Sequence, residues 1–321
     1  MPDLATAASE HWALVSVVVL LAFVAIETIW PDGRLRPDTT GRWLTHFAVY
    51  IADLVLSSTV APWVLLALLA DQGGLQGVRL FAPVEAAGGP WVVLAVGLVA
   101  IDFVVYWMHR IQHAVPFLWR FHAVHHADTE MDVSTALLHH PLAYLAMAIV
   151  AGLVLYAAGM PAWVFPVYGL FEVTVGAFQH VATPIPDKFE RAVRWLLVTP
   201  GMHQVHHSAD ARHYDQNFAN VLSVWDRLFG TLHWADAAER KGIRFGVEPY
   251  TGPQHRGLVW VFTMPARMRR QTIAGETDTP NSIEPIGNGG VWNGEDNDPV
   301  LADRLKSLVE IHAKRVERDS P

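Results

Sequence analysis

The stretch Trp107-Met-His-Arg-Ile-Gln-His113, followed after a short turn by Phe121-His-Ala-Val-His-His126, places two clusters of histidine close together in the chain. A third cluster, His203-Gln-Val-His-His207, repeats the spacing of the second cluster much later in the sequence. Residues three or four apart lie on one face of an α-helix. The spacing therefore predicts three helices, each of which directs its imidazoles to one side.

The number and spacing of these histidines indicate a metal site. Thirteen of the 17 histidines lie between residues 109 and 233. A single histidine or one pair is commonly a core or surface residue, but packing does not explain three sets. Neutral imidazole is the commonest metal ligand in proteins, and because one ion takes about four to six ligands, this set suits two ions with open positions. The candidate ligands are His109, His113, His122, His125, His126, His203, His206 and His207.

The composition is that of an apolar protein without cysteine. Of 321 residues, 52% are hydrophobic and only 17% are charged, which is more apolar than an ordinary soluble domain. The net charge of −8 gives no basic surface for nucleic acid, so no nucleic-acid partner is expected. The absence of cysteine excludes disulfides, iron–sulfur clusters, thiolate-ligated haem and cysteine-type zinc fingers.

Apolar runs predict an all-α, polytopic membrane bundle of about four or five spans, capped by a cytosolic histidine-rich region. Single spans are expected at residues 12–30, 47–70 and 91–108. The apolar stretch 142–179 is nearly twice the length of one span, so we expect a hairpin that returns to the side from which it started.

Basic residues predict how this bundle is oriented. The loop at 31–46 holds three arginines against one in the loop at 71–90, which places the first loop in the cytoplasm and the N-terminus outside. The third span then delivers His109 to the cytoplasmic face, and the hairpin leaves the rest of the chain there. All three histidine sets and the C-terminus are therefore expected on the cytoplasmic side.

Three further residues are candidates for the site. His180 ends the hairpin at the cytoplasmic face and is a candidate ninth ligand; the alternative is an interfacial histidine that is hydrogen-bonded to a carbonyl. Asp102 lies on the face of His109 one layer deeper, where it is expected either to orient a ligand histidine or to form a hydrogen bond between helices. His140, which with His139 precedes Pro141, is a weaker candidate for a ligand or for an outer contact.

The three sets resemble the histidine boxes of the fatty acid hydroxylase/sterol desaturase superfamily, whose members are integral-membrane di-iron enzymes. The flanking sequences strengthen the resemblance: Tyr106-Trp-Met-His-Arg110, Leu118-Trp-Arg-Phe-His122 and Trp225-Asp-Arg-Leu-Phe-Gly-Thr231. The resemblance covers roughly residues 90–235. It implies that the boxed histidines are di-iron ligands, and His180 matches a further histidine found between the second and third boxes.

The resemblance also implies an activity. We expect an oxidoreductase that uses two non-haem iron ions and O2 to hydroxylate, or else desaturate, a C–H bond of a membrane lipid such as a sterol, fatty acyl or sphingolipid chain. Hydroxylation is favoured on superfamily frequency alone. The sequence has no dinucleotide-binding, P-loop or His-Pro-Gly-Gly haem motif, so electrons are expected from NAD(P)H through a separate donor, a ferredoxin or a cytochrome with its reductase.

Other readings of the histidines are weaker, with one exception. The sequence has no Glu-x-x-His and no His-Glu-x-x-His motif, which argues against a carboxylate-bridged di-iron bundle and against a zinc protease. The alternative that stays open is a non-enzymatic membrane zinc- or iron-binding protein or transporter.

The chain is expected to divide into three parts. Residues 1–270 are a membrane-embedded hydroxylase/desaturase domain, with the histidine-box core at about 90–235. Residues 271–298, rich in Gly, Pro, Asn and acid, are expected to be a disordered linker. Residues 299–321 carry a leucine stripe and are expected to form a C-terminal amphipathic helix.

Overall fold

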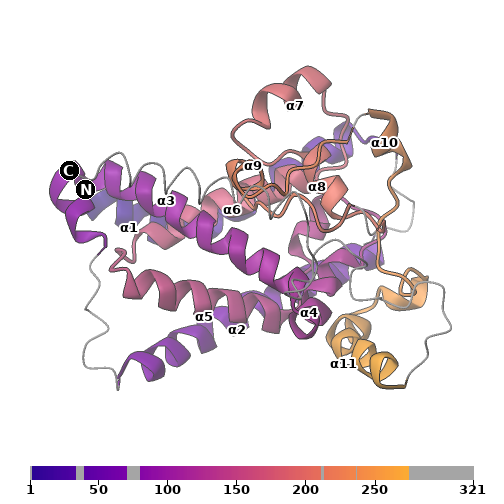
Figure 1. Cartoon of the computed structure of the whole chain (residues 1–321), viewed down its shortest axis with the longest axis horizontal. Helices are drawn as coiled ribbons and strands as arrows, with labels where there is room; N and C mark the ends of the chain where they lie inside the picture. Colours follow the sequence, from indigo (N-terminus) through magenta and orange to yellow (C-terminus); the bar gives the residue numbers. More distant parts are fainter. Residues whose placement is uncertain (1, 34–39, 71–79, 211–212, 236, 275–321) are drawn as a thin grey trace, which may run out of the picture. The chain divides into compact units, whose positions relative to one another are not determined.

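The computed structural model describes residues 2–33, 40–70, 80–210, 213–235 and 237–274, and the regular elements in these ranges are helical (Figure 1). Within the same ranges no β-strand forms, and only single bridges join Leu197 to Leu222 and Ser208 to Phe245. The longer helices are α1 (Pro2–Ile29), α2 (Thr40–Ala70), α3 (Ala82–Ala114), α5 (Pro141–Ala157) and α6 (Val164–His180). The shorter ones are α4 (Pro116–His126), η2 (Val133–Leu137), α7 (Asp187–Val193), α8 (Pro200–His206), α9 (Val224–Leu228), α10 (Ala237–Gly242), η3 (Pro253–His255) and α11 (Leu258–Ala274). The all-α prediction is confirmed for this part of the chain.

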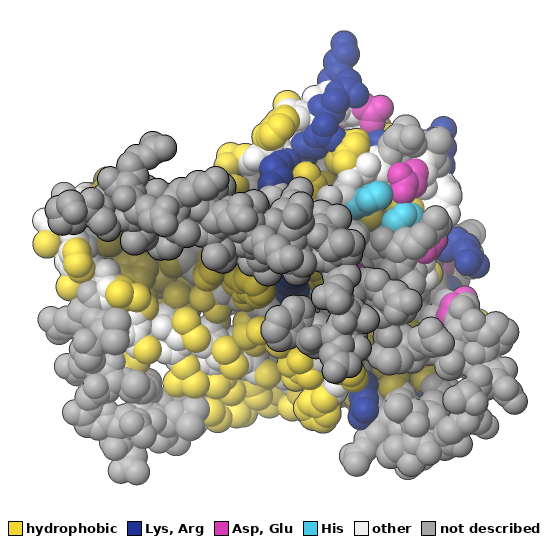
Figure 2. Space-filling model, viewed as in Figure 1, with side chains coloured by type: hydrophobic (Ala, Val, Ile, Leu, Met, Phe, Trp, Pro, Cys, Tyr) yellow, Lys and Arg dark blue, Asp and Glu magenta, His cyan; other side chains and the backbone are white. Residues whose placement is uncertain are grey.

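The longer helices leave apolar faces exposed. Thr40–Ala61 of α2 and Gly88–Ala114 of α3 are long and apolar enough to cross a membrane, while Leu14–Ile29 of α1 and Pro141–Ala157 of α5 are apolar but shorter. Leu21 of α1 and Phe47 of α2 are examples of exposed apolar side chains. Figure 2 shows hydrophobic side chains over the helical bundle, whereas charged side chains gather toward α7 and α10.

The candidate ligands lie at one end of the long helices, which we call the histidine end. α3 and α6 reach it with their last turns, which carry His113 and His180, and α5 reaches it with its first residues. The end of α1 is fixed there by Glu27, which accepts hydrogen bonds from the backbone N–H of Val133 (3.0 Å) and of Ala182 (2.8 Å). Because successive long helices run in alternate directions, segments far apart in sequence meet at this end.

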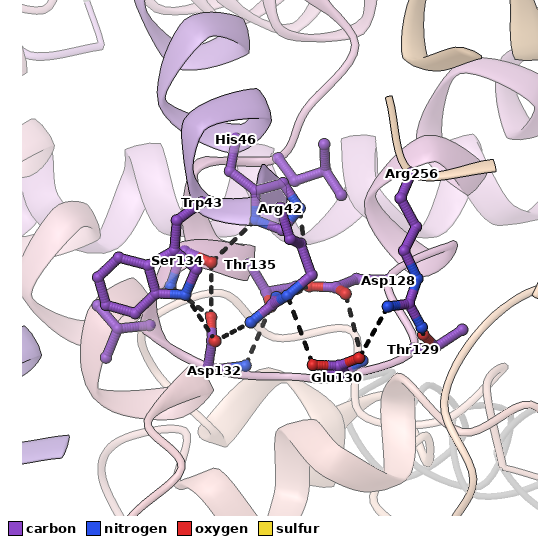
Figure 3. A network of polar contacts seen from close by, with 12 residues as sticks. Arg42, Trp43, His46, Asp128, Thr129, Glu130, Asp132, Ser134, Thr135 and Arg256 are labelled. Atoms are coloured by element: carbon purple, nitrogen blue, oxygen red, sulfur yellow. Dashed lines mark hydrogen bonds and ion pairs between the residues drawn. The ribbon is translucent and has the colours of Figure 1, made fainter. Parts of the chain in front are cut away.

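The start of α2 is held at the histidine end by a buried polar network (Figure 3). Arg42 donates to Asp128 Oδ2 (2.7 Å) and to Asp132, and its Nε lies 3.9 Å from Glu130 Oε2. Arg256 binds Glu130 from the other side (2.9 Å). The three carboxylates belong to the segment that follows the second histidine set, so the network connects α2 to the residues next to the candidate site.

Several helix boundaries differ from those expected. α2 begins at Thr40 rather than at residue 47, so Arg42, expected in a basic loop, is instead a buried helical residue. Within α3 the backbone is non-helical at Gly89 (φ +64°), directly before Pro90, which places the break where glycine tolerates a positive φ. Pro200 occupies the first turn of α8, and Thr199, the N-cap residue, makes no side-chain capping bond.

The predicted hairpin corresponds to α5 and α6, which are joined by residues 158–163. Residues 271–274 are the end of α11. The rest of the linker predicted at 271–298 and the helix predicted at 299–321 lie outside the described residues.

Candidate metal centre

Nine buried histidines gather at the histidine end in two groups, within each of which the ligand nitrogens lie within 4.8 Å of one another. The five-histidine group consists of His109, His113, His122, His126 and His206. The four-histidine group consists of His125, His180, His203 and His207. Neighbouring residues of a helix point about 100° apart. His125 therefore belongs to the four-histidine group, whereas His126 beside it belongs to the five-histidine group. The eight boxed histidines and His180 are thereby brought together, as the sequence predicts for a shared centre.

Backbone carbonyls fix the protonation of several of these rings. A carbonyl oxygen only accepts hydrogen bonds, so an Nδ1 that contacts one must carry the ring proton, and Nε2 then holds a free lone pair. Four rings are tied in this way, from His109 to Phe218 O (2.8 Å), from His125 to Leu138 O (3.0 Å), from His180 to Gly176 O (2.7 Å) and from His206 to Gln216 O (2.8 Å).

Within each group, the Nε2 atoms of different histidines face one another at short range. His109 and His206 approach to 3.0 Å between their Nε2 atoms, although both ring protons are used at Nδ1. Two lone pairs that face each other at this distance repel unless a cation binds both. The corresponding distance is 3.0 Å for His180–His203, 3.1 Å for His203–His207 and 3.3 Å for His122–His126. The donor set therefore fits a pair of metal ions held by neutral imidazole.

Burial keeps the imidazoles of α4 and α8 neutral. It lowers the pKa of His122, His125 and His126 well below the ordinary value, because a charged ring loses its hydration there, and neighbouring histidines lower each pKa further. The pKa values of His203, His206 and His207 are lowered for the same reason. Neutral rings are the form that binds metal.

His139 and His140 have different environments. The His140 ring accepts the backbone N–H of Leu142 at Nδ1 (3.2 Å) and so caps the start of α5, and it belongs to neither histidine group. His139 instead stacks on His125, with ring centroids 4.3 Å apart, and burial lowers its pKa to about 3. Of this pair, His139 is the one that contacts a candidate ligand.

Asp102 of α3 connects this helix to α6 and to residues 221–225. Its carboxylate accepts hydrogen bonds from Tyr168 Oη (3.0 Å) and from the backbone N–H of Val221 (3.1 Å) at Oδ1, and from Leu222 N–H (2.9 Å) and Trp225 Nε1–H (2.8 Å) at Oδ2. Among the described residues no hydrogen bond joins it to a histidine. It is therefore connected to the centre indirectly, through Tyr168 of α6 and through the segment near Phe218, whose carbonyl binds His109.

Replacing Asp102 with Asn should lower the free energy of unfolding by about 1–3 kcal/mol, because the amide nitrogen cannot accept and leaves at least one buried backbone N–H unpaired in either orientation. Unfolding of the detergent-solubilised protein, followed by circular dichroism, measures this loss. Glu85→Gln is the matched control, since Glu85 is exposed in the first turn of the same helix and should change stability by less than about 0.5 kcal/mol. Equal stability of Asp102→Asn and wild type would contradict the anchoring role.

The carboxylate that does contact a boxed histidine is Asp215, which the sequence reasoning missed. Its Oδ1 lies 3.3 Å from His113 Nδ1, and burial raises the pKa of Asp215 to about 7. Asp215 lies in a loop with no helical register relative to α3, so no spacing rule pairs it with His113. Tyr214 beside it stacks on Trp119, and Trp119 in turn packs against the His113 ring.

Comparison with known proteins gives the chain a family and several relatives. Residues 94–231 match the family model of the fatty acid hydroxylases. Human alkylglycerol monooxygenase is 31% identical over 159 residues, which cover 49% of this chain and 33% of that protein. Ornithine lipid hydroxylase OlsE of Rhizobium tropici is 31% identical over 228 residues, which cover 67% of this chain and 66% of that protein. The chain belongs to the fatty acid hydroxylase/sterol desaturase superfamily.

The fatty acid hydroxylase match contains every boxed histidine and ends at Thr231. Thr231 closes the motif that begins at Trp225, and its hydroxyl contacts Tyr106 Oη (2.9 Å) and donates to Asp226 (2.8 Å). The motif thus packs the end of the hydroxylase domain onto α3.

The chain spans about a third of the length of the human and Xenopus tropicalis alkylglycerol monooxygenases. No solved structure matches it. The apolar helices and the lipid-modifying relatives indicate a membrane protein.

Proposed function

We propose that this chain is a dioxygen-dependent di-iron enzyme that hydroxylates, or desaturates, a C–H bond of a membrane lipid. The observation that carries the proposal is the approach of His109 Nε2 to His206 Nε2 with both Nδ1 atoms tied to carbonyls, repeated by close Nε2 contacts in the four-histidine group. The nine histidines would hold two iron ions, one in each group.

Two ferrous ions, when bound, supply two of the electrons that dioxygen needs to attack an unactivated C–H bond. The residues of the chain hold the imidazoles in place and keep water out. The carbonyls of Phe218, Leu138, Gly176 and Gln216 set the direction of four rings, and Trp119 with Tyr214 covers the His113 side. The C–H bond that is oxidised would supply the other two electrons. Since the chain offers no nucleotide-binding motif, a ferredoxin or a cytochrome with its reductase would return to the irons, from NAD(P)H, the two electrons that they give up.

The substrate is proposed to be a lipid that enters from the bilayer. The exposed apolar faces of α1, α2 and α3 suit contact with lipid, and the relatives named for alkylglycerol and ornithine lipid act on amphiphiles. We place the N-terminus outside and the histidine end on the cytoplasmic face, as the basic residues predict.

The test is to purify the protein anaerobically, to count its metals, and to compare the lipids of cells with and without it. We expect about two irons per chain, one in each histidine group, and a lipid that has gained one oxygen atom or lost two hydrogen atoms. A single zinc with unchanged lipids would instead favour a non-enzymatic metal-binding protein or transporter.

A further inference from the structure

A third cluster of metal-binding side chains lies outside both histidine groups. It consists of His213, His233 and Glu239, whose ligand atoms all lie within 4.8 Å of one another. The Nε2 of His213 is 3.0 Å from Glu239 Oε1, and the Nε2 of His233 is 3.2 Å from the same oxygen. Three donors that come from separate segments therefore converge on one point.

The spacing of these donors suits a divalent ion of the zinc class. Ligand atoms that bind a tetrahedral zinc ion at about 2.0–2.2 Å stand about 3.3–3.6 Å from one another, slightly farther apart than the two nitrogen–oxygen distances here, so small side-chain shifts admit the ion. Two imidazoles and one carboxylate are a donor set that zinc accepts, and they leave one position for water. The side chains of His233 and Glu239 are 37% and 36% exposed, which gives an ion a path of entry, whereas His213 is only 12% exposed.

Surrounding contacts hold the donors in place. The Nδ1 of His213 contacts Ser208 Oγ (3.4 Å), the kind of outer contact that orients a metal-binding imidazole. The backbone of His233 is fixed at both ends by Asn217, which accepts its N–H (2.8 Å) and donates to its carbonyl (2.8 Å).

Glu239 is positioned by the residue that follows it. Arg240 binds Glu190 (2.8 Å) and Asp187 (2.7 Å), which fastens α10 to α7.

We propose that His213, His233 and Glu239 bind a third metal ion, a divalent cation of the zinc class, independently of the two histidine groups. The ion links the segment after the third histidine set to α10. That segment carries Asp215 and the Gln216 carbonyl, which orient His113 and His206. The third ion therefore has a structural role next to the main centre and takes no part in its chemistry.

The test counts metals in the full-length, detergent-solubilised protein after exposure to Zn2+ and removal of the excess. Wild type should retain one more ion per chain than His233→Ala and than Glu239→Ala, as measured by elemental mass spectrometry. His11→Ala, at an exposed position of α1, is the control and should retain the wild-type count. Because the result is a difference between variants, it does not depend on which metal fills the histidine groups.

Three outcomes decide the question. Loss of one ion in both variants, with the remaining ions retained, supports the proposal. Equal counts in wild type and Glu239→Ala overturn it and leave a hydrogen-bonded cluster without a metal. Loss of all ions also overturns it, because the three residues would then support the main centre instead of binding an ion of their own.

Discussion

Replacing His125 with Ala should abolish lipid oxidation and remove the metal of the four-histidine group, while the helical fold survives. His125 supplies one of the four imidazoles of that group, and its Nδ1 is already committed to Leu138 O (3.0 Å). Loss of an outer partner of a metal ligand typically lowers metal affinity or activity by about 10–100-fold. Loss of a ligand itself should lower both by more than that. Iron content, product formation and circular dichroism measured on one preparation test the three parts together.

His140→Ala is the matched control for that substitution. His140 is also buried and lies close in sequence to the second histidine set, but its ring caps α5 and belongs to neither group. Its removal should cost about 0.5–2 kcal/mol of stability and leave the metal content unchanged. Full activity of His125→Ala, or loss of iron in His140→Ala with the fold intact, would contradict the proposed ligand set.

The histidines that gather in the two groups can be predicted from the sequence because the relevant spacing is local. Residues three and four apart share a helix face in any fold, so the faces of α3, α4 and α8 follow from the histidine positions alone. The prediction that the three sets meet rests on the membrane topology, which places all of them on one side. In the structure, the alternate directions of the long helices bring them to one end. His180 was reached by the same reasoning, from the end of a hairpin arm.

The contacts that orient the first histidine set could not be predicted, since they join residues about a hundred positions apart. His109 is held by Phe218 O and His113 by Asp215, and no periodicity connects α3 with a loop. Asp102 lies on the expected face, yet its oxygens are taken by Tyr168 and by the loop at 221–225. Carbonyl partners leave no signal in the sequence, because every residue carries a carbonyl.

The roles of Arg42 and Glu27 were missed for a related reason. Arginine near the end of an apolar run is usually a marker of membrane topology, and a lone acid within such a run is usually a contact between helices. Here Arg42 neutralises carboxylates from a segment far along the chain. Glu27 accepts the backbone N–H of Val133, at the start of η2, and of Ala182, just beyond α6. Both roles require the tertiary structure.

Replacing Arg42 with Met should destabilise the protein by about 3–5 kcal/mol, the range observed when one partner of a buried ion pair is removed. The guanidinium is almost fully buried, and its loss would leave Asp128 and Asp132 without their cation (Figure 3). Burial alone would raise the pKa of Asp128, but the Arg42 guanidinium and His46 hold that pKa below its ordinary value. Thermal unfolding in detergent, with iron content measured alongside, gives both the stability loss and its effect on the adjacent second histidine set.

Comparing Arg256→Met with Arg42→Met tests whether the stability loss comes from the burial of the arginine or from the loss of a positive charge alone. Arg256 binds Glu130 of the same network (2.9 Å), but its side chain is 26% exposed, so its removal should cost no more than about 1 kcal/mol. Arg42→Lys should fall between the two, because a single ammonium group cannot bridge two carboxylates as a guanidinium does. Adding Asp132→Asn to Arg42→Met should recover part of the stability, since one fewer buried charge is left unpaired. If Arg42→Met and Arg256→Met are equally mild, the network contributes contacts but no electrostatic stabilisation, and the link between α2 and the metal centre has to be sought in apolar packing.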